Sequence, residues 1–336
     1  MATERAPSAG RRRLLALAVA VAVLAAVGAS LEWDEVGRRM AQAGPVLLAV
    51  CTLVYLPPWV LRGLRWRQLA ADLGDSVPLW PATCLATVGN MLNLILPAKA
   101  GDLLWTHAAH VRWGVPYGRG VVGVLAGRVL DLVVLAGLGG VALVALPTGQ
   151  EEHGATVALS VAAVLGGGIL GVQLVLRRRL ARPLLRGPLA RLVPLHDALV
   201  GPADALTGSP ARAVLHCSTT GVIWLNETLV AWLLAQGMGL DVSLAASMFA
   251  IMVANLSKIV PLTPASIGTY EVAGAIALGV VGVPYEDAFA VVLVEHLLKN
   301  GVNLILGLVA LWIEDLPVFS ADLSGVRRAW AQLKGA

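Results

Sequence analysis

Long apolar stretches without a charged side chain constrain this sequence more than any other feature. Residues 14–31 and 155–176 form uninterrupted runs of 18 and 22 residues that contain no Asp, Glu, Lys or Arg. A helix needs about 20 such residues to cross the hydrocarbon core of a bilayer. Of the 336 residues, 57% are apolar and only 14% are charged, against roughly 25% charged in a soluble domain. The sequence therefore predicts an all-α, polytopic membrane protein and excludes a soluble enzyme, a nucleic-acid binder and a secreted disulfide module.

Six apolar segments are interpreted as full membrane spans. They are residues 14–31, 45–61, 120–146, 155–176, 214–235 and 288–313. Two further segments, 79–113 and 243–283, are interrupted by prolines and glycines, and each has a second arm too short for a crossing. We predict that these two are re-entrant hairpins. For 79–113, one full span followed by an interfacial helix is the alternative.

The interruptions of the two hairpins lie at Pro97 and Gly101 in the first, and at Pro261, Pro264 and Gly268 in the second. Proline removes a backbone donor, and glycine permits conformations that a Cβ forbids. Unpaired backbone at membrane depth is tolerated only where it faces protein or water. We therefore expect both interruptions to line a polar cavity.

The basic residues predict the orientation. With the N-terminus inside, 19 of the 25 Lys and Arg fall in cytoplasmic segments, as the positive-inside rule requires. This count places Arg62, Arg65 and Arg67 in a loop that closes the second span. It predicts a basic cytoplasmic segment at 1–13, a transmembrane domain at 14–315 and a cytoplasmic tail at 316–336. We expect a multi-pass protein of the plasma membrane with both termini in the cytoplasm.

An internal repeat divides the chain into halves at about 14–146 and 155–313. The motif Gly114-Val-Pro-Tyr117 recurs as Gly282-Val-Pro-Tyr285, at an offset of 168 residues. The same offset aligns Arg128 with His296, Asp131 with Lys299, and Gly139 with Gly307. Each half holds three crossings, an odd number, so the halves would insert with opposite orientation. Inverted repeats with broken helices are typical of transporters, which expose one site to either side in turn.

Besides Arg112 near the end of the first hairpin, nine charged residues fall within the predicted spans or hairpins, where a buried charge costs at least about 2.5–3.5 kcal/mol and usually has a partner or a function. Eight of them are interpreted as a binding site for a charged lipid head group: Lys99, Asp102, Arg128, Asp131, Lys258, Glu271, Glu295 and Lys299. Glu227 has no local partner, which makes it the candidate for proton coupling. The alternative is structural, with Arg128–Asp131 and Glu295–Lys299 forming pairs along single helices. No metal site, cofactor site or catalytic nucleophile is predicted.

Three motifs carry a resemblance to a known family. They are Asn90-x-x-Asn93-x-x-x-Pro97-Ala-Lys-Ala-Gly-Asp102, Gly127-Arg128-Val-Leu-Asp131, and Pro261-x-x-Pro264-x-x-x-Gly268-x-x-Glu271. Over residues 14–315 the chain resembles the lysylphosphatidylglycerol synthetase transmembrane-region family, also called flippase-like integral membrane proteins. The resemblance implies movement of a phospholipid between leaflets, and some stand-alone members are implicated in glycan-lipid pathways.

The chain departs from the family pattern at four positions. Family members often have Arg and Glu where this chain has Lys99 and Asp102, Glu where it has Gly127, and Gly where it has Ala265. Charge is kept at 99 and 102, so a phosphate site is still expected. Only a short tail follows residue 315, so an aminoacyl-transferase domain and lipid synthesis are not expected.

Together these features predict a flippase-like protein that translocates an anionic amphiphilic lipid, either a phospholipid or a lipid-linked glycan precursor. A lipid-modifying or glycan-assembly enzyme is a possible partner, and no nucleic acid is expected to bind. Two alternatives stay open at this point: a membrane-embedded transferase that acts on a polyprenyl-phosphate lipid, and a scaffold subunit for a separate enzyme. No feature of the sequence predicts an oligomeric state.

Overall fold

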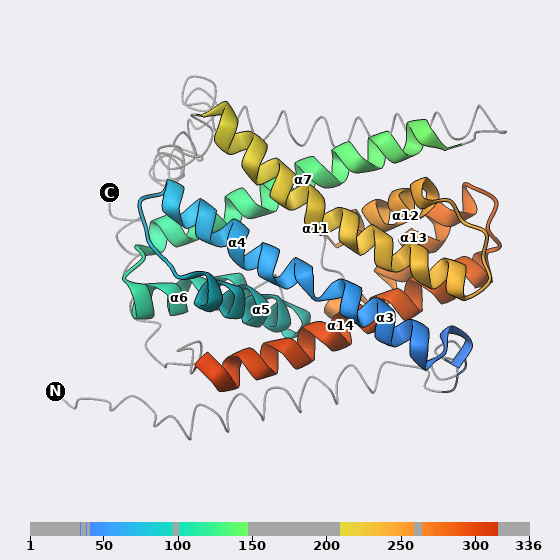
Figure 1. The fold of residues 1–336 in the computed structure, drawn as a ribbon, viewed down its shortest axis with the longest axis horizontal. Helices are drawn as coiled ribbons and strands as arrows, with labels where there is room; N and C mark the ends of the chain where they lie inside the picture. Colours follow the sequence, from blue (N-terminus) through green and yellow to red (C-terminus); the bar gives the residue numbers. More distant parts are fainter. Residues whose placement is uncertain are drawn as a thin grey trace, which may run out of the picture.

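The computed structural model describes Asp34, Arg38 and residues 41–96, 101–146, 209–258 and 264–314. Every regular element in these residues is a helix (Figure 1), so the predicted all-α class is confirmed there. The predicted spans at 14–31 and 155–176, the terminal segments 1–13 and 316–336, and the residues Pro97, Lys99 and Pro261 lie outside the described residues.

Nine α-helices and one 3₁₀ turn make up the described part of the chain. They are α3 (Pro45–Tyr55), α4 (Pro57–Asp72), α5 (Leu79–Ile95), α6 (Gly101–Trp113), α7 (Tyr117–Ala145), α11 (Pro210–Gly237), α12 (Leu244–Ser257), η3 (Pro264–Ser266), α13 (Thr269–Gly279) and α14 (Tyr285–Glu314). Three helical segments are long and apolar enough to cross a bilayer: Pro45–Asp72, Tyr117–Ala145 and Tyr285–Glu314. The 28-residue α11 covers the span predicted at 214–235.

The predicted end of the second span at Leu61 is wrong. Helices α3 and α4 join at Leu56, whose backbone is itself helical (φ −70°, ψ −45°), and continue to Asp72. Pro57 is tolerated because proline at the first position of a helix removes only an N–H that would lack a helical partner anyway. Arg62 and Arg65 therefore lie within a continuous helical segment and not in a loop.

Two helical hairpins form where the sequence predicted them. Helix α5 packs against α6, and α12 packs against α13. The second hairpin turns through η3, where Ala265 and Ser266 have positive φ values of 52° and 60°. Gly268 caps α13 with a φ of 85°, and its N–H donates a hydrogen bond to Glu271 at 2.6 Å.

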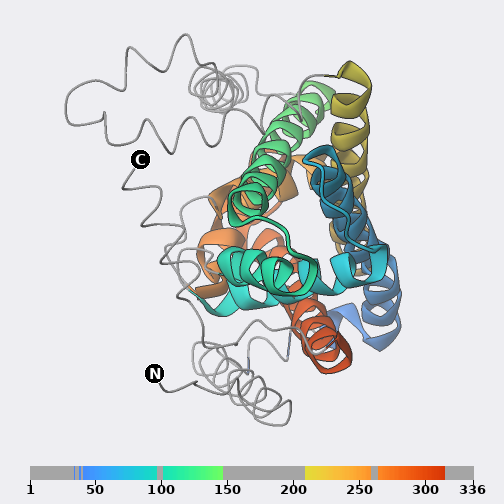
Figure 2. The same ribbon diagram turned by 90° about the vertical axis from the view of Figure 1, so that its left-hand side faces the viewer.

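Each hairpin packs against a long helix that is distant from it in the sequence. Helix α5 packs against α14, and α12 packs against α7. One apolar core surrounds α12 and α13, a second surrounds α5 and α6, and α14 contributes to both. Helices α4 and α11 run side by side in Figure 1 and are in contact. Figure 2 looks toward the end of the molecule where α6 and the C-terminal end of α14 lie.

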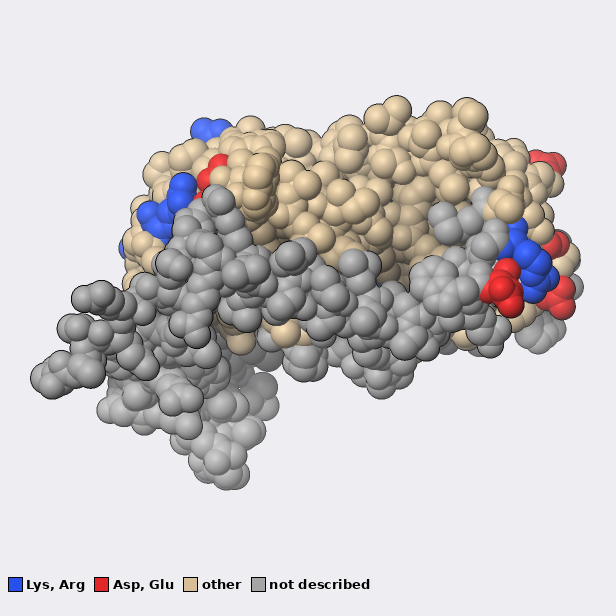
Figure 3. Space-filling view, turned by 90° about the horizontal axis from the view of Figure 1, so that it is seen from below, with Lys and Arg blue, Asp and Glu red and all other residues tan. Residues whose placement is uncertain are grey.

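The surface has the charge distribution of a membrane protein. In Figure 3, Lys, Arg, Asp and Glu gather at the two ends of the long axis, and the face between them is uncharged where it is described. Large apolar side chains are exposed on the described surface, for example Val144 at 89% and Trp312 at 66%. Such an apolar belt would be a liability in water, and it matches the hydrocarbon layer that the long helices can span.

Candidate functional site

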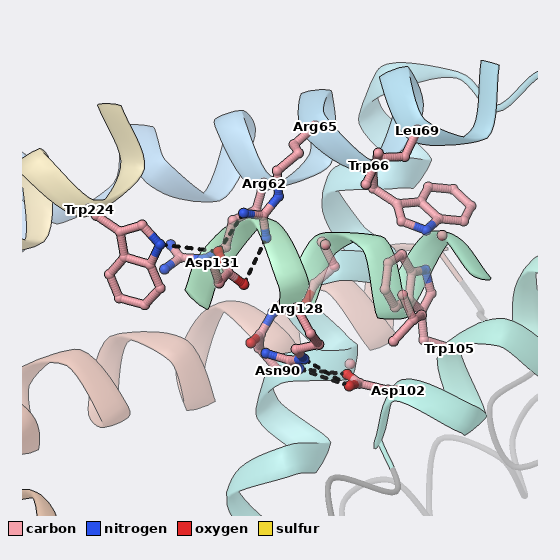
Figure 4. Close-up of a pocket in the computed structure, with 15 residues that line it drawn as sticks. Arg62, Arg65, Trp66, Leu69, Asn90, Asp102, Trp105, Arg128, Asp131 and Trp224 are labelled. Carbon is pink, nitrogen blue, oxygen red and sulfur yellow. Dashed lines mark hydrogen bonds and ion pairs between the residues drawn. The ribbon is translucent and has the colours of Figure 1, made fainter. Parts of the chain in front are cut away.

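A cavity of about 90 Å³ lies among α4, α5, α6, α7 and α11 (Figure 4). Its lining is unusual for the interior of an apolar bundle because it combines three guanidinium groups with three indole rings. The polar and aromatic lining residues are Arg62, Arg65, Arg128, Asp102, Asp131, Asn90, Trp66, Trp105 and Trp224. Two atoms of the lining are buried without a hydrogen-bond partner in the described residues, Arg62 Nη1 and Trp105 Nε1.

One ion pair of the cavity joins three helices. Arg65 of α4 makes a bidentate contact with Asp131 of α7, with Nη1–Oδ1 at 2.5 Å and Nη2–Oδ2 at 3.3 Å. Trp224 of α11 donates its indole N–H to the same carboxylate at 3.1 Å. Paired and charge-assisted bonds of this kind are stronger than neutral ones and fix orientation. The arrangement therefore holds α4, α7 and α11 around one side of the cavity.

A second ion pair fastens the first hairpin to α7. Asp102 lies in the first turn of α6 and accepts hydrogen bonds from Arg128 at 2.8 to 3.1 Å and from Asn93 at 2.8 Å. A Cβ at Gly101 would collide with the carbonyl oxygen of Gly89, so glycine lets α5 and α6 approach closely. The ion pair predicted within α7, between Arg128 and Asp131, is wrong. Helices α4 and α6 both contact α7, so Arg128 pairs with Asp102 of α6 and Asp131 pairs with Arg65 of α4.

A buried network connects α4, α11, α13 and α14 beside the cavity. Arg62 forms an ion pair with Glu227, whose other oxygen accepts from Lys299 at 2.7 Å. Lys299 also pairs with Glu295 at 2.5 Å, the contact predicted along α14. Tyr270 donates to Glu295 at 3.0 Å and accepts from Lys299 at 3.1 Å. Glu227, which had no partner within reach in sequence, thus contacts two cations from two other helices.

The first turn of α13 carries a further buried pair. His296 of α14 lies with Nδ1 at 2.6 Å from Glu271 Oε1, and both side chains are only 1% exposed. The histidine ring stacks on Tyr270 with centroids 4.1 Å apart, and Lys258 Nζ lies 3.9 Å from the centroid of the same tyrosine. His296 Nε2 is buried and has no hydrogen-bond partner among the described residues.

The structure divides the predicted site residues into two groups. Asp102, Arg128 and Asp131 line the cavity. Glu227, Lys258, Glu271, Glu295 and Lys299 belong to the network around α14. Lys99 lies outside the described residues. Pro264 begins η3 and Gly268 caps α13.

Sequence reasoning missed Arg62, Arg65 and His296 as site residues. The two arginines were missed because they were assigned to a loop that closes the second span after Leu61. His296 had a usable signal, since the repeat aligns it with Arg128. Across the described ranges, no group of three or more His, Cys, Asp and Glu side chains is placed to hold a metal ion.

Comparison with known proteins is consistent with this geometry. The family profile described as lysylphosphatidylglycerol synthase TM region matches residues 13–307. A glycosyltransferase, AglD, of Haloferax volcanii is 29% identical over 329 residues, which cover 87% of this chain and 52% of that protein. A UPF0104 membrane protein of Methanothermobacter thermautotrophicus is 24% identical over 287 residues, 78% of this chain and 81% of that protein. The chain thus spans about half the length of AglD.

Proposed function

Because the chain belongs to the lysylphosphatidylglycerol synthase transmembrane-region family, we propose that it moves an anionic amphiphilic lipid between the two leaflets of a membrane. The head group would pass through the cavity of Figure 4 while the acyl or prenyl tail stays in the bilayer. The observation that carries this proposal is the set of three arginines and three tryptophans that line one cavity inside an apolar helix bundle.

The charge of the cavity suits a phosphodiester. Three arginines and two aspartates line it, so the lining carries a formal charge of +1, and a phosphodiester carries one negative charge. Guanidinium groups bind phosphate oxygens in bidentate fashion, and indole rings offer an apolar face with a polar edge to glycerol or sugar. Its volume of about 90 Å³ equals that of about three water molecules in the liquid. A phosphate group fits, but a larger head group requires the helices to move apart.

We further infer that the two halves are inverted repeats. The segments Pro45–Asp72 and Pro210–Gly237 both have 28 residues. Arg62 and Glu227 each lie 17 residues after the start of their segment, and they contact each other. Such a contact between equivalent positions is expected on a pseudo-twofold axis.

Two glycines aligned by the repeat support the same relation. Gly139 of α7 packs on Met252 of α12, and Gly307 of α14 packs on Met91 of α5. Each glycine therefore meets a methionine of the hairpin in the other half. Halves of this kind can exchange conformations and open one site to either side of the membrane.

The orientation proposed for the chain has both termini in the cytoplasm of the plasma membrane. Three ion pairs, Asp75–Arg119, Asp72–Arg212 and Arg112–Glu314, lie at helix ends that would face the cytoplasm. Cysteine at exposed position 286 should react with an impermeant maleimide added to intact cells, and cysteine at exposed position 119 should not. Equal labelling at both positions would contradict the orientation.

The name of AglD adds lipid-linked glycans to the candidate substrates, because that relative is called a glycosyltransferase. A transferase activity of this chain itself is less well supported. Both carboxylates that line the cavity, Asp102 and Asp131, are in bidentate contact with arginine. A carboxylate held in this way is a poor general base, since its lone pairs are already used.

The test is lipid exchange in proteoliposomes that contain fluorescent phosphatidylglycerol, glycosyl-phosphoprenol or phosphatidylcholine. We expect exchange of the first two lipids and not of the zwitterionic one. The double variant Arg128→Gln/Asp102→Asn removes a cavity pair without leaving a lone buried charge, and it should reduce exchange at least about tenfold.

Arg119→Gln is the matched control, because Arg119 also lies on α7 but is exposed and pairs with Asp75. It should exchange lipid like the wild type. Unchanged exchange in Arg128→Gln/Asp102→Asn would overturn the proposed role of the cavity.

A further inference from the structure

We propose that the buried Glu271–His296 pair binds a proton, and that one proton crosses the membrane with each lipid head group. This inference rests on the proposed lipid translocation and adds its driving force. It moves the proton acceptor from Glu227, where the sequence suggested it, to the pair whose histidine stacks on Tyr270.

The balance of buried charges favours the uptake of one proton. We call the charged side chains of the cavity lining the cavity group, and the charged side chains around α13 and α14 the α14 group. The cavity group consists of Arg62, Arg65, Arg128, Asp102 and Asp131. The α14 group consists of Lys258, Lys299, Glu227, Glu271 and Glu295, together with His296.

With a neutral histidine, the cavity group has a formal charge of +1 and the α14 group of −1. The two charges cancel over the whole set. A monoanionic head group that enters the cavity neutralises the cavity group but leaves the α14 group at −1 inside the membrane. Excess charge at this depth is costly. A proton taken up by the α14 group makes both groups neutral, so the occupied state would carry one lipid anion and one proton.

Two of the three glutamates of the α14 group are poor proton acceptors because they are already paired with cations. Both oxygens of Glu227 contact cations, Arg62 and Lys299. Glu295 contacts Lys299 and accepts from Tyr270. Protonation of either glutamate would break an ion pair with a buried cation, which is unfavourable by several kcal/mol.

Glu271 and His296 contact no Lys or Arg side chain through a hydrogen bond or ion pair in the described part of the chain. Glu271 Oε2 accepts from the Gly268 N–H, and Oε1 faces His296 Nδ1. The other ring nitrogen, Nε2, is buried and unpartnered among the described residues. In the proposed step a proton from water forms an N–H bond at Nε2, while Nδ1–H keeps its bond to Glu271. The pair changes from charge −1 to 0, and no other reactant is needed.

Titratable side chains from several helices lie around the pair. Helix α13 contributes Tyr270, the end of α12 contributes Lys258, and α14 itself contributes Glu295 and Lys299. Helix α11 contributes Glu227 and α3 contributes Tyr55. Helix α5, which packs against α14, carries no acidic or basic side chain. A cation on His296 would be in direct contact with the carboxylate of Glu271, while the like charges of Lys258 and Lys299 lie near the ring of Tyr270 on which His296 stacks.

Glu271 also links the pair to the turn of the second hairpin. Glu271 holds both His296 and the N–H of Gly268, the residue that caps α13 after the break. A change of charge at His296 therefore acts on the group that fixes the turn of the second hairpin. Proton binding and movement of this hairpin would be coupled through a single carboxylate.

The test uses proteoliposomes of phosphatidylcholine with a trace of fluorescent phosphatidylglycerol. For one proton per monoanion, an imposed gradient of one pH unit should enrich the lipid about tenfold in the leaflet on the alkaline side. A potassium diffusion potential alone should have no effect, because the coupled step moves no net charge. An enrichment that follows the potential and not the pH gradient would overturn the coupling.

Variants locate the proton site. His296→Arg places a permanent cation there, as at Arg128, so lipid exchange should persist without any response to the pH gradient. Glu271→Gln should lose the response as well. His216→Gln is the matched control, because His216 is also buried and pairs with an acid, Asp72 at 2.7 Å, outside both groups. A full pH response in His296→Arg would contradict the proposal.

A measurement on the wild type removes any dependence on how well the variants fold. Addition of phosphatidylglycerol to the purified protein in weakly buffered detergent should take up about one proton per bound lipid, reported by a pH indicator. Lipid binding without proton uptake overturns the coupling but leaves the proposed translocation intact. Absence of any lipid movement in wild-type proteoliposomes would overturn the translocation and, with it, the coupling.

Discussion

The α5–α6 hairpin and the α12–α13 hairpin each fasten the first turn of their second arm to the following long helix through one carboxylate. In the first hairpin Asp102 holds Arg128, and these side chains are 14% and 35% exposed. In the second hairpin Glu271 holds His296, and each side chain is 1% exposed. Arginine keeps its charge in proteins, whereas histidine titrates near neutral pH. The two hairpins therefore differ: the first holds a carboxylate–arginine pair beside a cavity, and the second holds a fully buried carboxylate–histidine pair.

This difference teaches that two hairpins with the same kind of polar contact can differ in chemistry through the residue type of the basic partner. Both hairpins need a carboxylate at the start of the second arm to hold the break against a long helix. Only the basic partner differs in kind. A single substitution at such a position is enough to separate an anion site from a proton site, without any change in the path of the backbone.

The largest effect on stability should come from removing the carboxylate of Glu227, which pairs with Arg62 of α4 and Lys299 of α14. Glu227→Leu leaves Arg62 and Lys299 buried without their shared partner, and Lys299 then has only Glu295. Removal of one member of a buried ion pair typically destabilises by about 3–5 kcal/mol. We expect a loss of this size in the free energy of unfolding, measured by denaturant titration in detergent.

The control for this prediction is a surface pair. Glu314→Leu removes a partner of Arg112, whose side chain is 42% exposed, and should cost less than about 1 kcal/mol. The double variant Arg62→Met/Glu227→Leu should recover part of the loss because no arginine is then left without its partner, and Lys299 keeps Glu295. A loss of less than about 1 kcal/mol in Glu227→Leu would mean that the halves are held together by apolar packing alone.

A second comparison separates the roles of the two hairpin glycines. Gly101→Ala introduces a Cβ against the backbone of Gly89, whereas Gly268→Ala meets open space but has to adopt a φ of 85°. Overpacking of a tight contact costs about 1–3 kcal/mol, and a left-handed conformation costs an L-residue about 1–2 kcal/mol. Both variants should lower the unfolding free energy, and Gly101→Ala should also reduce lipid exchange because it displaces the carboxylate of Asp102. Equal exchange in both variants would show that the first hairpin tolerates such a displacement.

The next prediction concerns binding and not stability. Asp102→Asn removes the carboxylate that competes with a lipid phosphate for Arg128. The amount of phosphatidylglycerol retained by the protein should therefore increase about tenfold. This factor corresponds to about 1.4 kcal/mol of binding free energy, as expected for the release of one charge-assisted contact. Glu271→Gln, the equivalent change in the other half, lies away from the cavity and should leave binding unchanged. The measurement is mass spectrometry of lipids that co-purify in mild detergent. An increase in both variants would remove the distinction between the two pairs.

The helices and hairpins were predictable because their signals are local. Apolar runs, the breaks at Gly101 and Gly268 and the repeat all lie within short stretches of sequence. Among the ion pairs, Glu295–Lys299 was predictable for the same reason, since both residues lie on α14. The pairs between helices were not, since Arg128 and Asp131 are three residues apart and each has a partner on a different neighbouring helix, Asp102 on α6 and Arg65 on α4. Which neighbour lies on which side of α7 is a property of the tertiary fold.

The smallest effect is expected at the break of the second hairpin, where family members often have glycine and this chain has Ala265. Ala265 has a φ of 52°, a left-handed conformation that disfavours a Cβ by about 1–2 kcal/mol, while glycine loses about 0.5–1 kcal/mol more backbone entropy on folding. Ala265→Gly should therefore stabilise the protein by about 0.5–1 kcal/mol, measured as a rise in the denaturant midpoint with an unchanged slope. Gly44→Ala reverses the change at a φ of 73° with open space around it and should destabilise by a similar amount. If Ala265→Gly were destabilising, the strained turn would have to be held by contacts of the alanine methyl group, and the two hairpins would differ in how they turn as well as in what they bind.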